Sequence, residues 1–266
     1  MPERNFSLRV TTSSEAPSSR QRTHEQVVFC DFDGPIVDVS ERYYQTYRKG
    51  LLAIEKHAID QFGRALALNP LSKSQFWHMK QNRVADSEIA MRSGLPADLF
   101  ETFMQQVQRI VNHPSLLDWD CLQPTALSAL RHFKSCGVKV VLVTLRHPRQ
   151  VNTFLAENEL THFVDEIYGA FDINAAHANR VEQKRSLLSE AIAQQNAQGY
   201  ITHESWMVGD TEADIIAGRE LGLDTAALSC GVRSEGYLQK LNPSKVYGCL
   251  MSAAQDLAGS AVLQAA

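Results

Sequence analysis

The stretch VVFCDFDGPIVD, residues 27–38, places two carboxylates directly behind a hydrophobic run. Residues 27–30 are all apolar, a pattern typical of a strand buried on both faces, and Asp31 and Asp33 follow one residue apart. Two neighbouring negative charges repel each other, so the pair is costly unless a cation or a reaction uses it. The rest of the chain must supply one or the other.

Length and composition favour a protein with a large core and no nucleic-acid partner. The chain has 266 residues, 44% of them apolar, which predicts one large domain or a domain with an insertion. Lys and Arg number 26 against 30 Asp and Glu, and no basic stretch is present that would track a phosphate backbone. No apolar run approaches the roughly 18 residues of a spanning helix, so we expect a soluble protein without a membrane partner.

The cysteines and the N-terminal segment favour a cytoplasmic location. Five scattered cysteines without a C-x-x-C motif are typical of small buried thiols in a reducing compartment. Residues 1–25 are rich in Ser, Thr and Arg and poor in apolar residues, so we expect a disordered tail. A targeting peptide is the alternative, and the acidic residues in this segment argue against it.

From residue 122 onward, short β-branched runs alternate with helical patterns. The pattern predicts strands near 138–144, 164–168, 205–209 and 224–229 and helices near 124–135, 148–158, 181–198 and 212–221. This alternation is typical of parallel β-α units with helices on both faces of one sheet. With residues 27–31 as a further strand, we expect an α/β fold with a doubly wound, Rossmann-like core.

Between the first strand and residue 122 the pattern changes to amphipathic helices without a convincing strand. The helical patterns cover residues 40–62, 72–80, 85–93 and 96–111. We expect an α-helical cap, residues 39–120, inserted after the first strand, with hinges at 35–40 and 113–120. The catalytic core is then formed by residues 26–38 and 121–266.

Distinctive polar residues follow the predicted strands. Thr144 ends one strand, Asp210 follows another with Asp214 one helical turn further on, and Lys184 lies in the first turn of a helix. Alone, each has an ordinary structural explanation as a helix cap, a satisfied hydroxyl or a solvated cation. In a parallel sheet, however, all lie at the carboxyl edge where ligands bind. Together with Asp31 and Asp33 they predict a functional site.

This constellation resembles the haloacid dehalogenase superfamily of phosphohydrolases. Its first motif, Asp-x-Asp-Gly, is present as DFDG; its second, a hydrophobic strand closed by Ser or Thr, as VLVT; its third as Lys184; and its fourth, Gly-Asp-x-x-x-Asp, as GDTEAD. The resemblance covers about residues 27–250, including the helical insertion. It departs from the family where Gly34-Pro35 replaces the usual Gly-Thr and where no proline follows Lys184.

The resemblance implies a role for each motif residue. Asp31 is the nucleophile that forms an aspartyl-phosphate, and Asp33 is the general acid and base. Mg²⁺ is held by Asp31, the backbone carbonyl of Asp33, and Asp210, with Asp214 ligating through water or orienting its neighbours. Thr144 and Lys184 bind the phosphoryl group. The repulsion between Asp31 and Asp33 is then offset by Mg²⁺ and Lys184.

Three further cations are candidates for contacts with the substrate. Arg146 lies just beyond Thr144 and either touches substrate or caps a nearby carbonyl. Lys80 and Arg83 lie in a polar turn between two predicted cap helices, where the resemblance implies contact with the leaving group. An anionic leaving group would suit both, and a solvated position on the cap surface is an equal alternative.

The expected function is therefore Mg²⁺-dependent hydrolysis of a small phosphorylated metabolite. A sugar-phosphate mutase uses the same residues and stays open, as does a catalytically silent, metabolite-binding descendant of the fold. The presence of Asp33 argues against a dehalogenase, since the resemblance implies that dehalogenases lack this second aspartate. The sequence does not identify the substrate or the oligomeric state.

Overall fold

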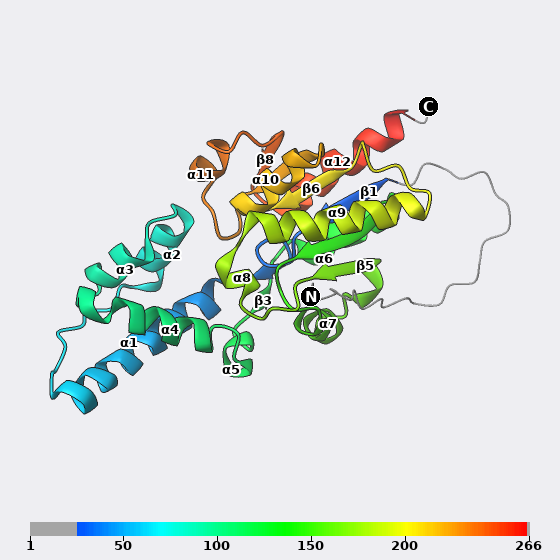
Figure 1. Cartoon of the computed structure of the whole chain (residues 1–266). Helices are drawn as coiled ribbons and strands as arrows, with labels where there is room; N and C mark the ends of the chain where they lie inside the picture. The colour runs from blue at the N-terminus through cyan, green and yellow to red at the C-terminus, as the bar shows by residue number, and fades with distance from the viewer. Residues whose placement is uncertain (1–25, 265–266) are drawn as a thin grey trace, which may run out of the picture.

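The computed structural model describes residues 26–264, with side chains up to residue 258. Six parallel strands form one sheet in the order β5-β4-β1-β6-β7-β8. Their bounds are β1 Val27–Cys30, β4 Lys139–Thr144, β5 Glu166–Gly169, β6 Trp206–Gly209, β7 Asp224–Leu228 and β8 Lys245–Tyr247. The prediction of a parallel, doubly wound α/β core with a helical insertion is confirmed (Figure 1).

Helices cover both faces of the sheet because neighbouring strand residues point to opposite sides. Val28 and Cys30 of β1 belong to the hydrophobic cluster that includes residues of α6, α7 and α12, whereas Val27 and Phe29 belong to the cluster with α9 and α10. The helices are α6 Ala126–Ser135, α7 Pro148–Glu157, α9 Val181–Ala197, α10 Glu212–Glu220 and α12 Leu250–Gln264. A strand buried on both faces explains why its sequence is continuously apolar.

The strand order places β1 at the point where the chain changes direction across the sheet. After β1 the chain builds β4 and β5 on one side and then returns to build β6, β7 and β8 on the other. The crevice beyond the carboxyl ends at such a switch point is where open α/β sheets bind ligands. Asp31, directly after β1, therefore lies at the topologically favoured position for a site.

The inserted helices form a second unit with a hydrophobic cluster of its own. They are α1 Ser40–Phe62, α2 Lys73–Gln81, α3 Asp86–Arg92 and α4 Phe100–Ile110, preceded by the 3₁₀ turn η1 Ala97–Leu99. Their buried apolar residues include Leu51, Ile54, Phe76, Ile89 and Phe103. Figure 1 shows this unit, in blue to green, beside the carboxyl edge of the sheet. We call it the cap; its boundaries at residues 39 and 120 stay a prediction.

Two short strands join the cap to the core, in a region where the sequence pattern predicts no strand. β2 (Val37–Asp38) pairs antiparallel with β3 (Cys121–Leu122), and the one-turn helix α5 (Pro114–Leu117) lies within the second predicted hinge. Two residues are too few to show a strand period, so the sequence pattern could not reveal this ribbon. The ribbon holds the two ends of the insertion side by side.

Other differences from the predictions are local. Strand β1 ends at Cys30 rather than residue 31, and the pattern over 96–111 is a 3₁₀ turn followed by a helix. The predictions did not include α8 Ala175–Ala178, α11 Glu235–Gln239, the 3₁₀ turn η2 Thr161–Phe163, β8 or α12. The expectation of buried thiols is wrong for Cys121 and Cys136, whose residues are exposed. The predicted disordered tail lies outside the described residues.

Candidate active site

Asp31 is held at the edge of the sheet with one carboxylate oxygen bonded and the other open. Its Oδ1 accepts hydrogen bonds from the backbone N–H of Phe32 at 2.8 Å and from Lys184 Nζ at 2.9 Å. Its own N–H donates to the carbonyl of Val208 in β6 at 2.8 Å. Among the described residues, none donates a hydrogen bond to Oδ2, although the side chain is only 8% exposed. Oδ2 is therefore the oxygen available to a ligand.

Lys184 connects two carboxylates at the bottom of the site. Its Nζ lies 2.9 Å from Asp31 Oδ1 and 2.7 Å from Asp214 Oδ1 and donates to the Val143 carbonyl at 3.0 Å. Burial lowers the pKa of Lys184, but the two carboxylates outweigh burial and hold the pKa above its ordinary value. The amine is therefore a fixed positive charge buried at the end of β4.

Three buried carboxylates, including that of Asp31, lie together at this end of the sheet. Ligand oxygens of Asp31, Asp210 and Asp214 are all within 4.8 Å of one another. Burial and the neighbouring carboxylates raise the pKa of Asp210 well above its ordinary range, and Asp210 Oδ1 has no hydrogen-bond partner among the described residues. Burial also raises the pKa of Asp31, to about 7, with Lys184 opposing the shift. An oxygen-only donor set with an unpaired buried carboxylate oxygen fits a hard divalent cation.

Glycines allow the backbone to approach these carboxylates closely. A Cβ on Gly34 would lie 2.2 Å from the Asp210 carboxyl carbon, and a Cβ on Gly231 would lie 2.1 Å from Asp210 Oδ2. Gly34 also has a φ of +100°, a conformation that side chains strongly disfavour. The Val232 N–H next to Gly231 donates to Asp210 Oδ2 at 2.5 Å. The space around Asp210 thus depends on two residues without side chains.

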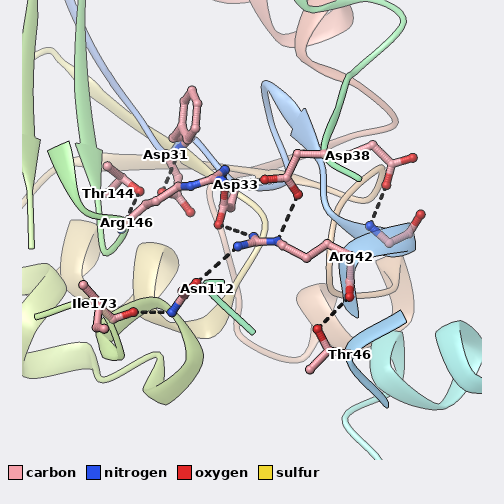
Figure 2. Close-up of polar contacts among 12 residues, drawn as sticks. Asp31, Asp33, Asp38, Arg42, Thr46, Asn112, Thr144, Arg146 and Ile173 are labelled. Carbon is pink, nitrogen blue, oxygen red and sulfur yellow. Dashed lines mark hydrogen bonds and ion pairs between the residues drawn. The ribbon is translucent and has the colours of Figure 1, made fainter. Parts of the chain in front are cut away.

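Asp33 is bound by two arginines, one from the cap and one from the core (Figure 2). Arg42 Nη2, from α1, lies 3.0 Å from Asp33 Oδ2, and Arg146 Nη1, from the loop after β4, lies 2.9 Å from Asp33 Oδ1. Burial raises the pKa of Asp33, but Arg146 and Arg42 outweigh it and the net shift is downward. The two arginines therefore favour the ionised form of Asp33 and fix its orientation.

A second carboxylate completes this arrangement. The carboxylate of Asp120, directly before β3, is 0% exposed and pairs with Arg42 Nε at 2.9 Å and with Arg146 Nη2. Arg42 also donates to Asn112 Oδ1 at 3.3 Å, and Asn112 in turn donates to the backbone carbonyl of Ile173 (Figure 2). Two arginines and two carboxylates thus balance each other where the cap meets the core. Arg42 and Asp120 were not among the predicted site residues.

The remaining predicted residues around β4 lie close to this site. Thr144 is 1% exposed, and its Oγ1 accepts from the Arg146 N–H at 3.1 Å. The Arg146 guanidinium binds carboxylates rather than the carbonyl considered above. His147 caps the N-terminus of α7 by accepting from the Arg149 N–H at 3.1 Å.

The polar turn of the cap contacts the core instead of standing free in solvent. Arg83 Nε lies 3.0 Å from Glu212 Oε1, and Arg233 Nε lies 2.7 Å from Glu212 Oε2. Lys80 pairs with Asp86 at 2.7 Å. The Ser234 N–H donates to the Gln81 carbonyl at 2.9 Å. The turn between α2 and α3 is therefore docked on the core loop that follows β7.

A cavity of about 80 Å³ lies between this turn and the end of the sheet. The core contributes Asp31, Asp33, Thr144, Arg146 and Lys184, and the cap contributes Lys80 and Arg83. The same cavity is lined by His177 and Asn179 from the segment around α8, which the sequence analysis missed. Of the predicted residues only Asp210 and Asp214 are absent from this lining, because they lie buried behind Asp31.

The parallel sheet, with Asp31 and Asp33 at its carboxyl edge, is the arrangement of a class of hydrolases that use paired aspartates. The chain matches the family model described as haloacid dehalogenase-like hydrolase over residues 27–228, and it belongs to this family. Over residues 26–264, no helix is both long and apolar enough to cross a membrane.

Known relatives are distant. The pyrophosphatase PpaX of Bacillus cereus strain Q1 is 23% identical over 81% of this chain and 88% of its own length. Matches to the same protein in other strains, such as G9842, reach 29% identity, but there the chain spans only about half of the relative's length. Solved structures with the same fold include a haloacid dehalogenase-like hydrolase from Streptococcus pneumoniae, with a TM-score of 0.59, 17% identity and coverage of 87% of this chain and 98% of that one.

A predicted phosphoglycolate phosphatase from Haemophilus somnus shares the fold to a similar extent. Its TM-score is 0.59 at 17% identity, with coverage of 88% of this chain and 99% of that one. At this identity the likeness establishes the fold, and the residues of this chain must carry the argument for function.

Proposed function

We propose that this protein is a Mg²⁺-dependent phosphohydrolase that cleaves small phosphorylated metabolites through an aspartyl-phosphate on Asp31. The observation that carries the proposal is the state of the Asp31 carboxylate, with Oδ1 fixed by Lys184 and Oδ2 open toward the cavity. A nucleophile needs one such free oxygen in a defined orientation.

The cation would be held by the carboxylates of Asp31 and Asp210 and the backbone carbonyl of Asp33, with Asp214 behind them. When bound, Mg²⁺ would supply charge neutralisation at the phosphoryl oxygens. Three cations of the chain assist. Lys184 offsets the negative charge that Asp31 and Asp214 share, and Arg146 and Arg42 hold Asp33 in place. Thr144 presents a hydroxyl at the cavity wall for a phosphoryl oxygen.

The reaction then has two displacements. Asp31 Oδ2 attacks phosphorus while the bond to the leaving-group oxygen breaks. Asp33 delivers a proton to that oxygen, so it must first take up a proton from solvent against the preference of its two arginine partners for the ionised form. Asp33 next takes a proton from water, which attacks phosphorus and releases Asp31 and inorganic phosphate. Both steps need Asp33 beside the cavity, where its two arginine partners hold it.

Phosphate release from an aryl phosphate tests the proposal. Wild-type protein should release phosphate with Mg²⁺ and stop in excess chelator, and Asp31→Asn should lose activity by at least a hundredfold while unfolding at the same temperature. Asp60→Asn, an exposed position of α1, is the matched control and should behave as wild type. Retention of a tenth of the rate by Asp31→Asn, with deamidation excluded, would remove Asp31 from this role.

The covalent step has its own readout. In Asp33→Asn the aspartyl-phosphate should form from an ester with a good leaving group and persist, because no base activates water. Rapid acid quenching should then trap labelled phosphate on the protein. Turnover at the wild-type rate on an ester with a poor leaving group would contradict the acid and base role. Binding without any turnover would favour the silent module, and return of phosphate to a second hydroxyl would favour the mutase.

The natural substrate is best sought in a panel. The names of relatives and structural neighbours favour inorganic diphosphate and phosphoglycolate as members, together with sugar phosphates and nucleoside monophosphates. We further propose that the protein acts in the cytoplasm, which the scattered, unpaired cysteines support.

A further inference from the structure

A second cavity lies inside the cap and adjoins the catalytic one. It measures about 50 Å³ and is lined mainly by residues of α1, α2, α3 and α4, among them Phe76, Ile89, Phe103 and Val107. Four residues, Tyr43, Lys80, Asp86 and His177, line both cavities. A molecule held at Asp31 can therefore extend past these four residues into the cap.

Two of the three hydroxyl groups in the wall of this cap cavity, those of Thr46 and Tyr47, are already bonded within the protein. Thr46 Oγ1 donates to the Arg42 carbonyl at 2.8 Å. The Tyr47 hydroxyl bonds with Ser93 Oγ at 2.6 Å and accepts from the Leu71 N–H at 2.8 Å. The interior of the cap cavity thus presents an apolar surface, which favours an apolar ligand over a polar one.

Three cations at the junction of the two cavities share two carboxylates. Lys80 pairs with Asp86, and Glu212 pairs with both Arg83 and Arg233. Burial lowers the pKa of His177, which favours its neutral ring. An anionic group on the substrate would meet cations already held by carboxylates, except at the two unbonded Nη groups of Arg83, whereas a neutral group breaks no ion pair.

One polar atom at the junction is still open. The Tyr43 hydroxyl makes no hydrogen bond with the other described residues, although the Tyr43 ring packs edge-on against Trp77 at 6.3 Å. It can therefore bond a single oxygen of a passing ligand, while the apolar remainder continues into the cap.

Resting on the phosphatase function proposed above, we propose that the cap cavity binds the apolar part of the leaving group. The substrate class is then phosphate monoesters of neutral alcohols that carry a short apolar chain or ring. A cavity smaller than the catalytic one limits that part to a few carbon atoms. Diphosphate and phosphoglycolate, which are anionic throughout, would leave the cap cavity empty.

A homologous series of n-alkyl phosphates tests this assignment. Ethyl, butyl and hexyl phosphate have leaving groups of nearly equal basicity, so differences in kcat/KM report binding of the chain. Each methylene that enters the cavity should raise kcat/KM by about fourfold until the cavity is full. A flat series, or better turnover of diphosphate and phosphoglycolate than of every alkyl ester, would overturn the assignment.

Variants at one position of α4 locate the effect. Val107→Phe fills the cavity and should abolish the increase of kcat/KM with alkyl length. Val107→Ala enlarges the cavity, so kcat/KM should continue to increase up to a longer alkyl group than in wild type. Gln108→Phe adds the same ring on the exposed face of α4 and should leave the series unchanged. If Val107→Phe does not fold, the kcat/KM values of the alkyl phosphates with wild type and with Val107→Ala still test whether the alkyl group binds in the cap cavity. If kcat/KM depends on alkyl length in Val107→Ala as it does in wild type, the alkyl group does not bind in the cap cavity.

Binding separates this inference from the phosphatase proposal. Alkylphosphonates, which cannot be hydrolysed, should bind more tightly as the chain lengthens in calorimetric titrations with Mg²⁺. Chain-dependent binding without turnover of any ester would contradict the catalytic proposal alone. Turnover of the esters combined with phosphonate binding that does not depend on alkyl length would contradict only the assignment of the cap cavity as the alkyl site.

Discussion

Arg42 of the cap and Asp33 of the core form an ion pair with 3.0 Å between Nη2 and Oδ2. Arg42 is 1% exposed and also binds Asp120, so it contacts both of the carboxylates that Arg146 binds. The pair joins the helix that begins the cap to the carboxylate proposed as acid and base. The position of the cap and the orientation of Asp33 are therefore linked.

Arg42→Met should be strongly destabilising and nearly inactive. Removing one partner of a buried pair costs about 3–5 kcal/mol because the remaining charge is left uncompensated. Chemical denaturation measures the loss, and activity on an ester with a poor leaving group should fall more than on an aryl phosphate, since only the former needs Asp33's proton. Lys49→Met, an exposed position of the same helix, should change neither. Equal loss on both esters would reduce Arg42 to a purely structural role.

Physics explains which parts of this site the sequence could predict. Asp31, Thr144 and Asp210 follow hydrophobic strands, and parallel strands bring their carboxyl ends to one edge. Arg42 lies nine residues beyond Asp33 on an amphipathic helix, where a cation ordinarily faces solvent. Asp120 lies in a segment without a period. Neither has a local signal, since their pairing depends on how the cap packs on the core.

The segment around α8 was missed for a related reason. Its helix is four residues long, so no helical period develops, and His177 stands among alanines in a loop between β5 and α9. For Gly34 the sequence predicts the position but not the structural reason for it. Gly34 was recognised within the first motif, but the close approach to Asp210 that requires it becomes visible only in three dimensions.

The docked turn of the cap gives a second prediction. Only Nε of Arg83 is bonded among the described residues, which leaves the two Nη groups for the leaving group. Arg83→Ala should lower kcat/KM for the preferred metabolite several-fold while changing hydrolysis of a small aryl phosphate little. Stability should change by about 0–1 kcal/mol, since the side chain is half exposed.

Glu212→Gln provides the comparison for Arg83. If Arg83 acts by contact with the leaving group, Arg83→Ala should be the more damaging of the two on the preferred metabolite. If Arg83 only fastens the cap to the core, both variants should lose activity equally, on the metabolite and on the aryl phosphate. No loss with either substrate would place Arg83 outside the site.

A pH-dependent contribution to stability is expected at the edge of the sheet, away from the active site. Burial raises the pKa of Glu166, but hydrogen bonds from Gln198, Tyr168 and Lys139 outweigh it and lower the pKa below its ordinary value of 4.5. A depressed carboxyl pKa stabilises the fold above that value and loses the effect as the pH falls through the folded-state pKa.

Glu166→Gln should therefore be less stable than wild type at pH 7, by about 1 kcal/mol for the lost charge-assisted bonds. The difference should shrink as the pH falls below 4.5. Urea unfolding at a series of pH values measures it, with Glu157→Gln on the exposed face of α7 as control. A difference that is constant with pH would mean that ionisation of Glu166 contributes nothing.

The close approach of Gly231 to Asp210 predicts a variant that loses the metal while keeping the fold. A Cβ at this position would lie 2.1 Å from Asp210 Oδ2, so Gly231→Ala must displace the carboxylate from its place beside Asp31. Mg²⁺ should raise the unfolding temperature of wild type, because a ligand that binds only the folded state stabilises it. Gly231→Ala should lose this increase and Mg²⁺-dependent hydrolysis together. Gly236→Ala, where a Cβ meets nothing within 4 Å, should keep both. A normal Mg²⁺ response in Gly231→Ala would show that Asp210 does not hold the cation.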